Sequence, residues 1–316
     1  MTAEPMPTCR ICGSVTEPAG HKLSEFSKRS FELAHCVTCR YSFVVNPRTD
    51  FAAIYDAAYY AGRGADPRVS YADAVANGGS VQEYEWSGIV RILTELGALR
   101  PGARWLDFGC GLGGLLRHGR SCGFDVSGFD EGYAADASAN AGLPILSADE
   151  LAAAAGTFDV VTAIEVVEHV LDPLEVFERM AALLRPGGLL FLTTGNARPY
   201  RGRLSSWQYV RPDIHVSFYE PQTLEFCMRR VGLTPARTGY RPGFTDVIRS
   251  KILRTVGVNR QNLLERVLPW GLLARVADRR FQVTEQPIGW RPIEAASDRE
   301  NTANRSAATA PRRLRG

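Results

Sequence analysis

The sequence predicts an α/β fold built on a mainly parallel β-sheet. Short apolar segments with strand character alternate with helical segments, and this alternation is typical of parallel sheets covered by helices on both faces. A helix with apolar residues at helical spacing is expected at 83–96, directly before the first strand of the series. The expected strands are residues 104–108, 124–129, 144–147, 158–164, 188–194, 233–238 and 288–295.

The first of these strands leads through Asp107 into a glycine-rich turn. Gly109, Gly111 and Gly113 follow the acid at alternate positions, and a helical segment comes next. Glycine allows a sharp turn and lets the backbone approach a ligand without a Cβ clash. This order of strand, glycine turn and helix suits a nucleotide-like ligand at the carboxyl end of a parallel strand. No Lys-Ser or Lys-Thr pair follows the glycines, which excludes a P-loop.

A second acid lies where a ribose-binding carboxylate is needed. Asp130 ends the strand at 124–129, about 20 residues after the glycines, and can accept both ribose hydroxyls. With these two motifs the chain resembles the class I S-adenosylmethionine-dependent methyltransferases. Their first motif matches residues 106–114, their fourth strand and the helix after it match 158–170, and their Pro-Gly-Gly turn into strand five matches 183–192.

The resemblance implies a Rossmann-like methyltransferase sheet with an antiparallel last strand, and it assigns roles around S-adenosylmethionine. Asp107 would face the amino end of the methionine moiety, and Asp130 would take the ribose. Asp149 or its neighbour Ala148 would lie beside the adenine, although Asp149 is equally expected to cap the helix that follows. The full set expected to bind the cofactor is Asp107, Gly109, Gly111, Gly113, Asp130, Asp149, Ile164 and Glu165, with the last two beside the sulfonium.

Two histidines are candidates for the catalytic base. His169 follows strand four, where a Glu-His pair mostly shapes the loop in this family. His215 follows strand five, where the methyl acceptor binds in this family. Zinc-containing sugar C-methyltransferases carry Tyr-His-Glu-His-x-x-Tyr there, with the last histidine as base; His215 and Tyr219 match its end, whereas Pro212 and Asp213 depart from it. His215 is therefore expected to be a base or a ligand of the acceptor, with a capping or core histidine as the alternative.

The cysteines predict a metal site near the N-terminus. Two C-x2-C pairs are separated by 23 residues, a spacing typical of tetrahedral zinc sites in which four thiolates close the coordination sphere. We therefore expect a structural Zn²⁺ ion. The predicted ligands are Cys9, Cys12, Cys36 and Cys39, and the three other cysteines, Cys110, Cys122 and Cys227, are expected to be core thiols.

The chain is expected to divide into several parts. The segment after the second C-x2-C pair resembles bacterial methyltransferases with an N-terminal zinc ribbon, which occur among enzymes that methylate sugars and other biosynthetic intermediates. Its Tyr55, Tyr59 and Tyr60 would share one face of a helix at 51–60, either packing on the catalytic domain or forming a lid over the cofactor. The predicted parts are a zinc ribbon (1–45), a helical linker or lid (46–84), the methyltransferase domain (85–297) with an insertion of two helices whose outer sides are basic (244–282), and a disordered tail (298–316).

Composition sets the class and excludes some partners. The 316 residues are 45% hydrophobic and 22% charged, which is ordinary for a globular protein. The net charge of +3 is too small to argue for nucleic acid by itself. The sequence contains no stretch of about 18 apolar residues, so no membrane span is predicted, and no secretory signal is visible. A cytoplasmic location is therefore expected, and the oligomeric state is left open.

Together these features predict methyl transfer from S-adenosylmethionine to a small molecule, such as a sugar or nucleotide-sugar intermediate, at oxygen, carbon or nitrogen. A ribosomal or transfer RNA methyltransferase can also carry a zinc ribbon. This ribbon, however, lacks the dense basic set with interleaved aromatic residues that RNA binding requires. The other alternative is a non-catalytic scaffold that binds the cofactor.

Overall fold

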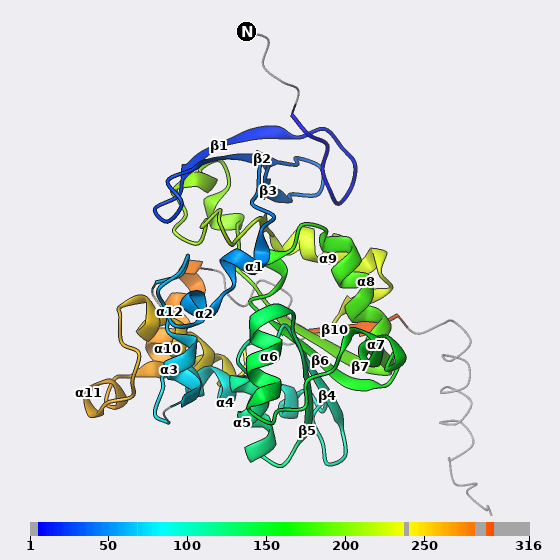
Figure 1. The fold of residues 1–316 in the computed structure, drawn as a ribbon, viewed down its shortest axis with the longest axis vertical. Coiled ribbons are helices and arrows are strands. Elements are labelled where there is room, and N and C mark those ends of the chain that lie inside the picture. Colours follow the sequence, from blue (N-terminus) through cyan, green and yellow to red (C-terminus); the bar gives the residue numbers. More distant parts are fainter. Residues whose placement is uncertain (1–5, 68, 77, 237–239, 282–288, 294–316) are drawn as a thin grey trace, which may run out of the picture.

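The computed structural model describes residues 6–67, 69–76, 78–236, 240–281 and 289–293. Within them lie a six-stranded central sheet wrapped by helices and a separate four-stranded sheet at one end of the molecule (Figure 1). The tail expected to be disordered, 298–316, lies outside the described residues. Among the described residues, no helix is both long and apolar enough to cross a bilayer.

The central sheet confirms the predicted α/β class. Its strand order is β5-β4-β6-β7-β10-β9; the first four strands are parallel, and β10 runs antiparallel between β7 and β9, as the resemblance implied. The bounds are β4 Arg104–Phe108, β5 Asp125–Phe129, β6 Phe158–Ile164, β7 Leu184–Thr193, β9 Leu233–Pro235 and β10 Gly289–Pro292.

The strand expected at 144–147 does not form. Gly128 donates a backbone hydrogen bond to Pro144 and accepts one from Leu146, which gives only an isolated bridge beside β5. The chain then turns away, because Ser147 caps the next helix. A second difference concerns β7, which starts at Leu184 rather than 188 because its first residue pairs with Phe158 across an irregularity in the ladder.

Helices cover both faces of the central sheet because its strands are apolar on both sides. Trp105 contributes to one buried cluster, whereas its neighbour Leu106 contributes to another, and the pairs Val160/Val161 and Leu189/Leu190 alternate in the same way. These helices are α4 Gln82–Glu95, α5 Gly114–Ser121, α6 Gly132–Asn140, α7 Ala148–Ala153, α8 Pro173–Leu183 and α9 Pro221–Arg230.

The cysteine-rich segment forms the smaller sheet, but not alone. The sheet contains β1 Glu17–Leu23, β2 Ser30–His35 and β3 Ser42–Val44, and its fourth strand is β8 Ser217–Phe218, which begins two residues after His215. Strand β3 begins three residues after Cys39, the last cysteine of the second pair. Its partner β8 shows that the ribbon and the methyltransferase part share one sheet.

The expected helix at 51–60 is two short helices, α1 Phe51–Ile54 and α2 Ala57–Tyr60. The break falls at Tyr55 and Asp56, because the Asp56 side chain accepts a hydrogen bond from the Tyr59 amide and so caps a new helix. A third short helix, α3 Tyr71–Ala76, follows.

The insertion after β9 contains three helices rather than the expected two: α10 Pro242–Thr255, α11 Leu263–Arg266 and α12 Trp270–Phe281. The second expected helix is divided because Pro269 precedes α12. Helix α10 packs closely on α4, where Gly88 and Gly243 bring the two backbones together. A Cβ atom on Gly88 would lie 2.5 Å from the Gly243 carbonyl oxygen.

We predict that Gly88→Ala destabilises the protein although it raises helix propensity. The new methyl group meets backbone atoms that cannot rotate away, so the free energy of unfolding should fall by about 1–3 kcal/mol in urea denaturation. Gly271→Ala, in α12, is the matched control. Nothing lies within 4 Å of that Cβ position, so stability should stay the same or rise by about 0.5–1 kcal/mol. Equal shifts in both variants would contradict the close α4–α10 contact.

Candidate active site

A cavity of about 610 Å³ lies at the carboxyl ends of β4, β5 and β6. The glycine turn forms one wall, and the tyrosines of the linker, the two histidines and α10 form the others. Eight of the predicted site residues line it: Asp107, Gly109, Gly111, Asp130, Ile164, Glu165, His169 and His215. Gly113 and Asp149 are not among the lining residues.

The glycine turn is shaped by left-handed backbone conformations. Gly109 and Gly111 have φ angles of +74° and +54°, which favour glycine. A Cβ on Gly109 would lie 2.5 Å from a Val166 methyl group. The Gly111 amide donates to Asp130 Oδ2 at 2.7 Å, and the Glu131 amide donates to Asp130 Oδ1 at 2.7 Å. The carboxylate is therefore held beside the turn, with remaining lone pairs for a ligand.

The two predicted residues outside the cavity have local roles. Gly113, with φ of +73°, is the N-cap of α5, and a Cβ there would overlap Leu143. Asp149 lies in the first turn of α7 and is exposed, so the expectation that it caps this helix is wrong. Ser147 is the cap, in a reciprocal pair with Glu150. Ala148 lines a second hollow next to Asp130.

Asp107 is buried at the base of the cavity. Its Oδ1 accepts a hydrogen bond of 2.7 Å from Thr162 Oγ1 on the neighbouring strand. Burial raises the pKa of this carboxyl to about 7, with the charge of Asp130 adding to the rise against the opposing Thr162 hydrogen bond. A cationic group placed above it would restore the charged form.

The end of β6 brings an ion pair into the cavity. Glu165 has φ of +54°, which is uncommon for a side chain other than glycine. Its Oε1 accepts from Thr193 Oγ1 at 3.0 Å and from Lys251 Nζ at 2.7 Å. Burial alone would raise the pKa of Glu165, but the Lys251 ammonium lowers it to about 2. The basic side chains of the insertion were expected on its outer sides, which is wrong for Lys251, because α10 directs it into the cavity.

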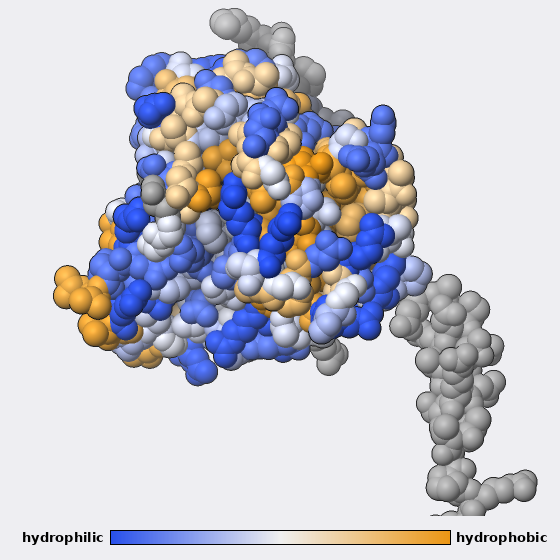
Figure 2. Space-filling model, turned by 60° about the horizontal axis from the view of Figure 1, so that its bottom comes forward, coloured by the Kyte–Doolittle hydropathy of each residue, from blue (hydrophilic) through white to orange (hydrophobic). Residues whose placement is uncertain are grey.

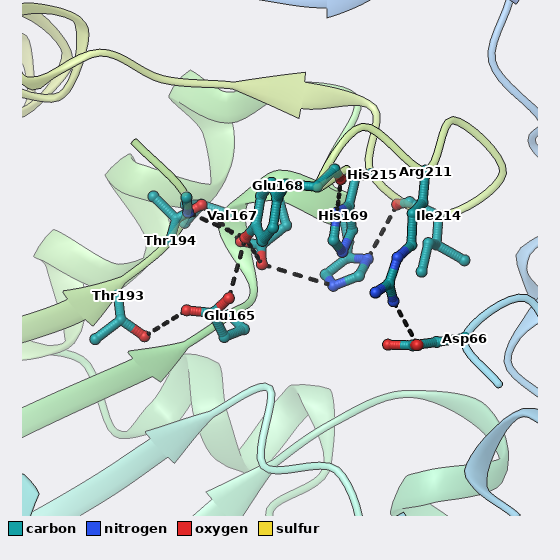
Figure 3. A network of polar contacts seen from close by, with 12 residues as sticks. Asp66, Glu165, Val167, Glu168, His169, Thr193, Thr194, Arg211, Ile214 and His215 are labelled. Carbon is teal, nitrogen blue, oxygen red and sulfur yellow. Dashed lines mark hydrogen bonds and ion pairs between the residues drawn. The ribbon is translucent and has the colours of Figure 1, made fainter. Parts of the chain in front are cut away.

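A second carboxyl, that of Glu168, is fully buried near Glu165 (Figure 3). The Tyr209 hydroxyl lies 2.5 Å from Glu168 Oε1 and 3.1 Å from Glu165 Oε2. Burial, and to a smaller extent the negative charge of Glu165, raise the pKa of Glu168 to about 8. The Tyr209 hydroxyl has one proton and can donate it to only one of these two carboxyl oxygens. The other contact needs a proton on the carboxyl itself, and the raised pKa of Glu168 places that proton on Glu168 at neutral pH.

The two candidate histidines lie against each other although 46 positions separate them, with ring centroids 4.8 Å apart (Figure 3). His169 Nδ1 lies 3.0 Å from the Ile214 carbonyl and 2.8 Å from the Tyr55 hydroxyl. His215 Nδ1 lies 2.6 Å from the Tyr209 carbonyl oxygen. A carbonyl only accepts, so His215 Nδ1 must donate, and its Nε2 carries the lone pair.

Burial favours the neutral form of both rings. Burial lowers the pKa of His169 to about 4. Burial also lowers the pKa of His215 well below its usual value, and the neighbouring His169 lowers it further. Glu168, His169 and His215 each offer one ligand atom, and these atoms lie within 4.8 Å of one another, so the same three groups also have the spacing of a possible metal site.

The linker tyrosines complete the cavity. Tyr55, Tyr59, Tyr60 and Tyr71 all line it and contact one another through their rings. Tyr60 also stacks on Tyr133, at a centroid distance of 5.6 Å, just after Asp130. These tyrosines pack on the methyltransferase part, as the first alternative expects, and they also line the cavity, whereas a lid over the cofactor stays a prediction.

The cysteine cluster lies apart from this cavity, on the turns before β1 and between β2 and β3. Cys9 Sγ is 3.5 Å from Cys39 Sγ, Cys12 Sγ is 3.4 Å from Cys36 Sγ, and all four sulfurs lie within 4.8 Å of one another. With zinc–sulfur bonds of about 2.3 Å, a tetrahedral ion fits this spacing. Of the other cysteines, Cys110 and Cys227 are buried as expected, but Cys122 is exposed.

Comparisons with known proteins agree with this architecture. A family model described as a methyltransferase domain matches residues 81–237. A ubiquinone biosynthesis O-methyltransferase of Xanthomonas axonopodis pv. citri is 39% identical over 164 residues, which are 46% of this chain and 68% of that protein. The corresponding protein of Xanthomonas campestris pv. campestris is 41% identical over 110 residues, 31% of this chain and 46% of that protein.

Among solved structures, phosphoethanolamine N-methyltransferase 2 of Haemonchus contortus, in complex with S-adenosyl-L-methionine, aligns with a TM-score of 0.45 and 16% identity. The alignment covers 80% of this chain and 62% of that chain.

A parallel sheet with a glycine turn, an acid after β5 and these sequence matches define a class I S-adenosylmethionine-dependent methyltransferase. The chain belongs to this family, and the resemblance seen in the sequence is confirmed. The matched part spans about half the length of the first curated relatives, 46% of the Xanthomonas campestris protein. These relatives are named as O-methyltransferases of ubiquinone biosynthesis, so their names give no support to the expected sugar acceptor.

The proton on Glu168 predicts a pH dependence of stability. A carboxyl whose pKa rises from 4.5 to about 8 on folding binds more protons in the folded than in the unfolded state between these values. Stability from this group is therefore present below pH 4.5 and is lost as the pH rises toward 8. In urea denaturation, the free energy of unfolding should fall between pH 5 and 8 by on the order of 2 kcal/mol more in wild type than in Glu168→Gln. Parallel pH curves for the two proteins would contradict this assignment.

Proposed function

We propose that this protein transfers the methyl group of S-adenosylmethionine to a hydroxyl oxygen of a small aromatic molecule. The observation that carries the proposal is the fixed His215 tautomer in a cavity walled by tyrosines and open to the glycine turn. The relatives support oxygen as the acceptor atom, because they are named O-methyltransferases.

The residues of the glycine turn suit the cofactor. Asp130 can accept the ribose hydroxyls with the lone pairs that Gly111 and Glu131 leave free. Asp107, with its buried carboxyl, can accept from the amino group of the methionine moiety. Ala148 lines the hollow beyond Asp130, where the adenine would lie, and Ile164 and Glu165 would flank the sulfonium. When bound, S-adenosylmethionine supplies an electrophilic methyl group.

His215 acts as the base in this proposal. Its Nε2 accepts the hydroxyl proton of the acceptor while the oxygen forms a bond to the methyl carbon and the carbon–sulfur bond breaks. The products are a methyl ether and S-adenosylhomocysteine, and the proton on His215 then passes to water. His169 packs on His215 and contacts Tyr55, so it positions the base and the tyrosine wall.

The chemistry of His215 favours a phenolic hydroxyl over a sugar hydroxyl. Burial weakens this base, so its proton acceptor role suits a hydroxyl that is already acidic. A phenol has a pKa near about 10, as in tyrosine, whereas an alcohol is far less acidic. The rings of Tyr59 and Tyr71 also offer flat apolar surface for an aromatic acceptor. Both oxygens of Glu168 already hold hydrogen bonds, with Tyr209 and Thr194, so we assign proton transfer rather than metal binding to this cluster.

The proposal is tested with methyl-labelled S-adenosylmethionine and two sets of acceptors, simple catechols and nucleotide sugars. Label is expected in a catechol methyl ether. His215→Ala should lower turnover by roughly 10²–10⁴-fold, the usual range for a lost general base. Adenosylhomocysteine affinity, measured by calorimetry, should stay nearly intact because His215 lies on the acceptor side.

Asp130→Ala is the contrasting variant. It should weaken adenosylhomocysteine binding by about 1.5–3 kcal/mol through loss of charge-assisted hydrogen bonds. Label in a nucleotide sugar would overturn the aromatic acceptor. More than about a tenth of wild-type turnover in His215→Ala would show that positioning, not a base, carries the reaction.

We also propose that Cys9, Cys12, Cys36 and Cys39 bind a structural Zn²⁺ ion. Four thiolates leave no open position, so the ion would hold the two turns together and take no part in the reaction. The sulfur separations and the burial of Cys9, Cys36 and Cys39 support this role.

Purified protein should therefore contain one zinc ion per chain, and Cys36→Ser should release it, as metal analysis would detect. The ribbon should then lose protection in hydrogen exchange, while adenosylhomocysteine affinity changes little because the glycine turn lies in the other sheet. Cys122→Ser is the matched control, since this thiol is exposed and outside the cluster, and it should keep the metal. Protein that contains no zinc and has four freely titrating thiols would contradict the proposal.

A further inference from the structure

The insertion ends in an exposed apolar surface, here called the insertion tip. It is formed by exposed aliphatic side chains of α11, of α12 and of the turn between them. Leu264 is 82% exposed, Val267 80%, Leu263 79% and Leu272 63%. Exposed aliphatic side chains are usually scattered singly over a protein surface, whereas a contiguous group of them marks an interaction site. The tip consists of Leu263, Leu264, Val267, Leu268, Leu272 and Val276. Figure 2 shows it as an apolar protrusion at the left edge, where Figure 1 places α11.

The insertion tip is held in place from its inner side. Glu265 is buried, accepts a 2.7 Å hydrogen bond from the Tyr84 hydroxyl and forms an ion pair with Arg249. Trp270 is also buried and donates to the Glu265 carbonyl at 2.7 Å. Arg249 in turn lies 3.7 Å from the centre of the Tyr84 ring. The inner positions are thus filled by other side chains, which leaves the aliphatic ones directed outward.

The fully exposed charges around the insertion tip are cationic, and the one acid of α12, Asp278, is partly buried. Four exposed arginines flank the aliphatic residues, whereas Glu265 is buried and neutralised by Arg249. Aliphatic side chains bordered by arginines match the interface of an anionic lipid bilayer, where apolar groups enter the acyl boundary and guanidinium groups meet phosphates. The arginines are Arg266, Arg275, Arg279 and Arg280.

We propose that the insertion tip docks the protein on the surface of an anionic phospholipid membrane. A symmetric pairing of two copies through this face would place arginines against arginines, which disfavours a dimer. Nucleic acid would match the arginines but would leave the leucines without an apolar partner. The membrane satisfies both features, and the inference does not rest on the proposed acceptor.

Docking would also place the cavity near the lipid surface. Helix α10, which leads into the insertion tip, contributes Lys251, Arg254 and Thr255 to the lining of the cavity. One continuous insertion therefore forms part of the site and carries the lipid-binding surface, so an acceptor dissolved in the membrane would reach the site directly.

The test is co-sedimentation of the full chain with two kinds of vesicle, phosphatidylcholine alone and phosphatidylcholine with about 30% phosphatidylglycerol. Binding to the anionic vesicles should exceed binding to the neutral ones at least about tenfold. The double variant Leu264→Glu/Val267→Glu should lose at least about tenfold of this binding, because two inserting side chains become charged. Arg279→Gln should weaken it roughly fivefold, the contribution of one cation near such a surface.

Leu23→Glu is the matched control, because Leu23 is 65% exposed but lies in β1 of the ribbon sheet; it should bind as wild type. Circular dichroism melting should show that all variants are folded. The proposal is overturned if the double variant binds vesicles like wild type, if Leu23→Glu loses binding equally, or if both vesicle types bind alike. It is also overturned if sedimentation equilibrium finds a dimer that the double variant dissociates while vesicle binding is absent.

Discussion

The hydrogen bond from the Val216 amide to the Glu168 carbonyl, 2.8 Å long, joins the two segments that carry the histidines. One segment follows β6 and the other follows β7, and neither is part of a long helix or strand. Ser217 reinforces the junction, since its hydroxyl donates to the Val170 carbonyl at 2.8 Å. These two bonds, together with the contacts of His169 with Ile214 and of Tyr209 with Glu168, hold the two loops against each other.

Val216 and Ser217 also join the ribbon to the cavity. The Val44 amide donates to the Val216 carbonyl at 2.9 Å, and the Tyr41 hydroxyl lies 2.6 Å from Ser217 Oγ. Each of these contacts lies within two residues of His215. A metal that fixes the turns beside β3 would therefore also fix the strand next to the proposed base. This gives the ribbon a structural role in the site although its cysteines do not line the cavity.

The part of the site that could be predicted from the sequence is the part made by local geometry. Gly109, Gly111 and Asp130 follow from a turn and a strand end that are short in sequence, so their positions are set by neighbouring residues. The alternative that Asp149 caps α7 is wrong because Ser147, two positions earlier, forms the reciprocal pair with Glu150. The choice between these two candidate capping residues depends on where the chain turns away from β5 after the bridge at Ile145, and this point cannot be read from the sequence.

The acceptor side could not be predicted in the same way, because its groups come from distant segments. Lys251 lies on an amphipathic helix whose cations were all expected to face solvent, and its partner Glu165 is 86 positions away. Tyr209 lies in a segment without a motif. Strand β8 has only two residues, too few for a periodic signal, so its pairing with β3 depends on the packing of Trp207, Phe218 and Phe31 in one buried cluster.

The two acids that follow β6 depend on the insertion for a compensating charge. Glu165 and Glu168 face the same tyrosine hydroxyl, and two anions at that separation in a buried site would repel strongly. Lys251 stabilises the charge on Glu165, and the proton on Glu168 removes the second charge. Helix α10 therefore supplies the cation that lets β6 end in two neighbouring acids. The left-handed backbone at Glu165 is part of the same arrangement, because it directs the carboxylate toward Lys251 and Thr193 rather than along the strand.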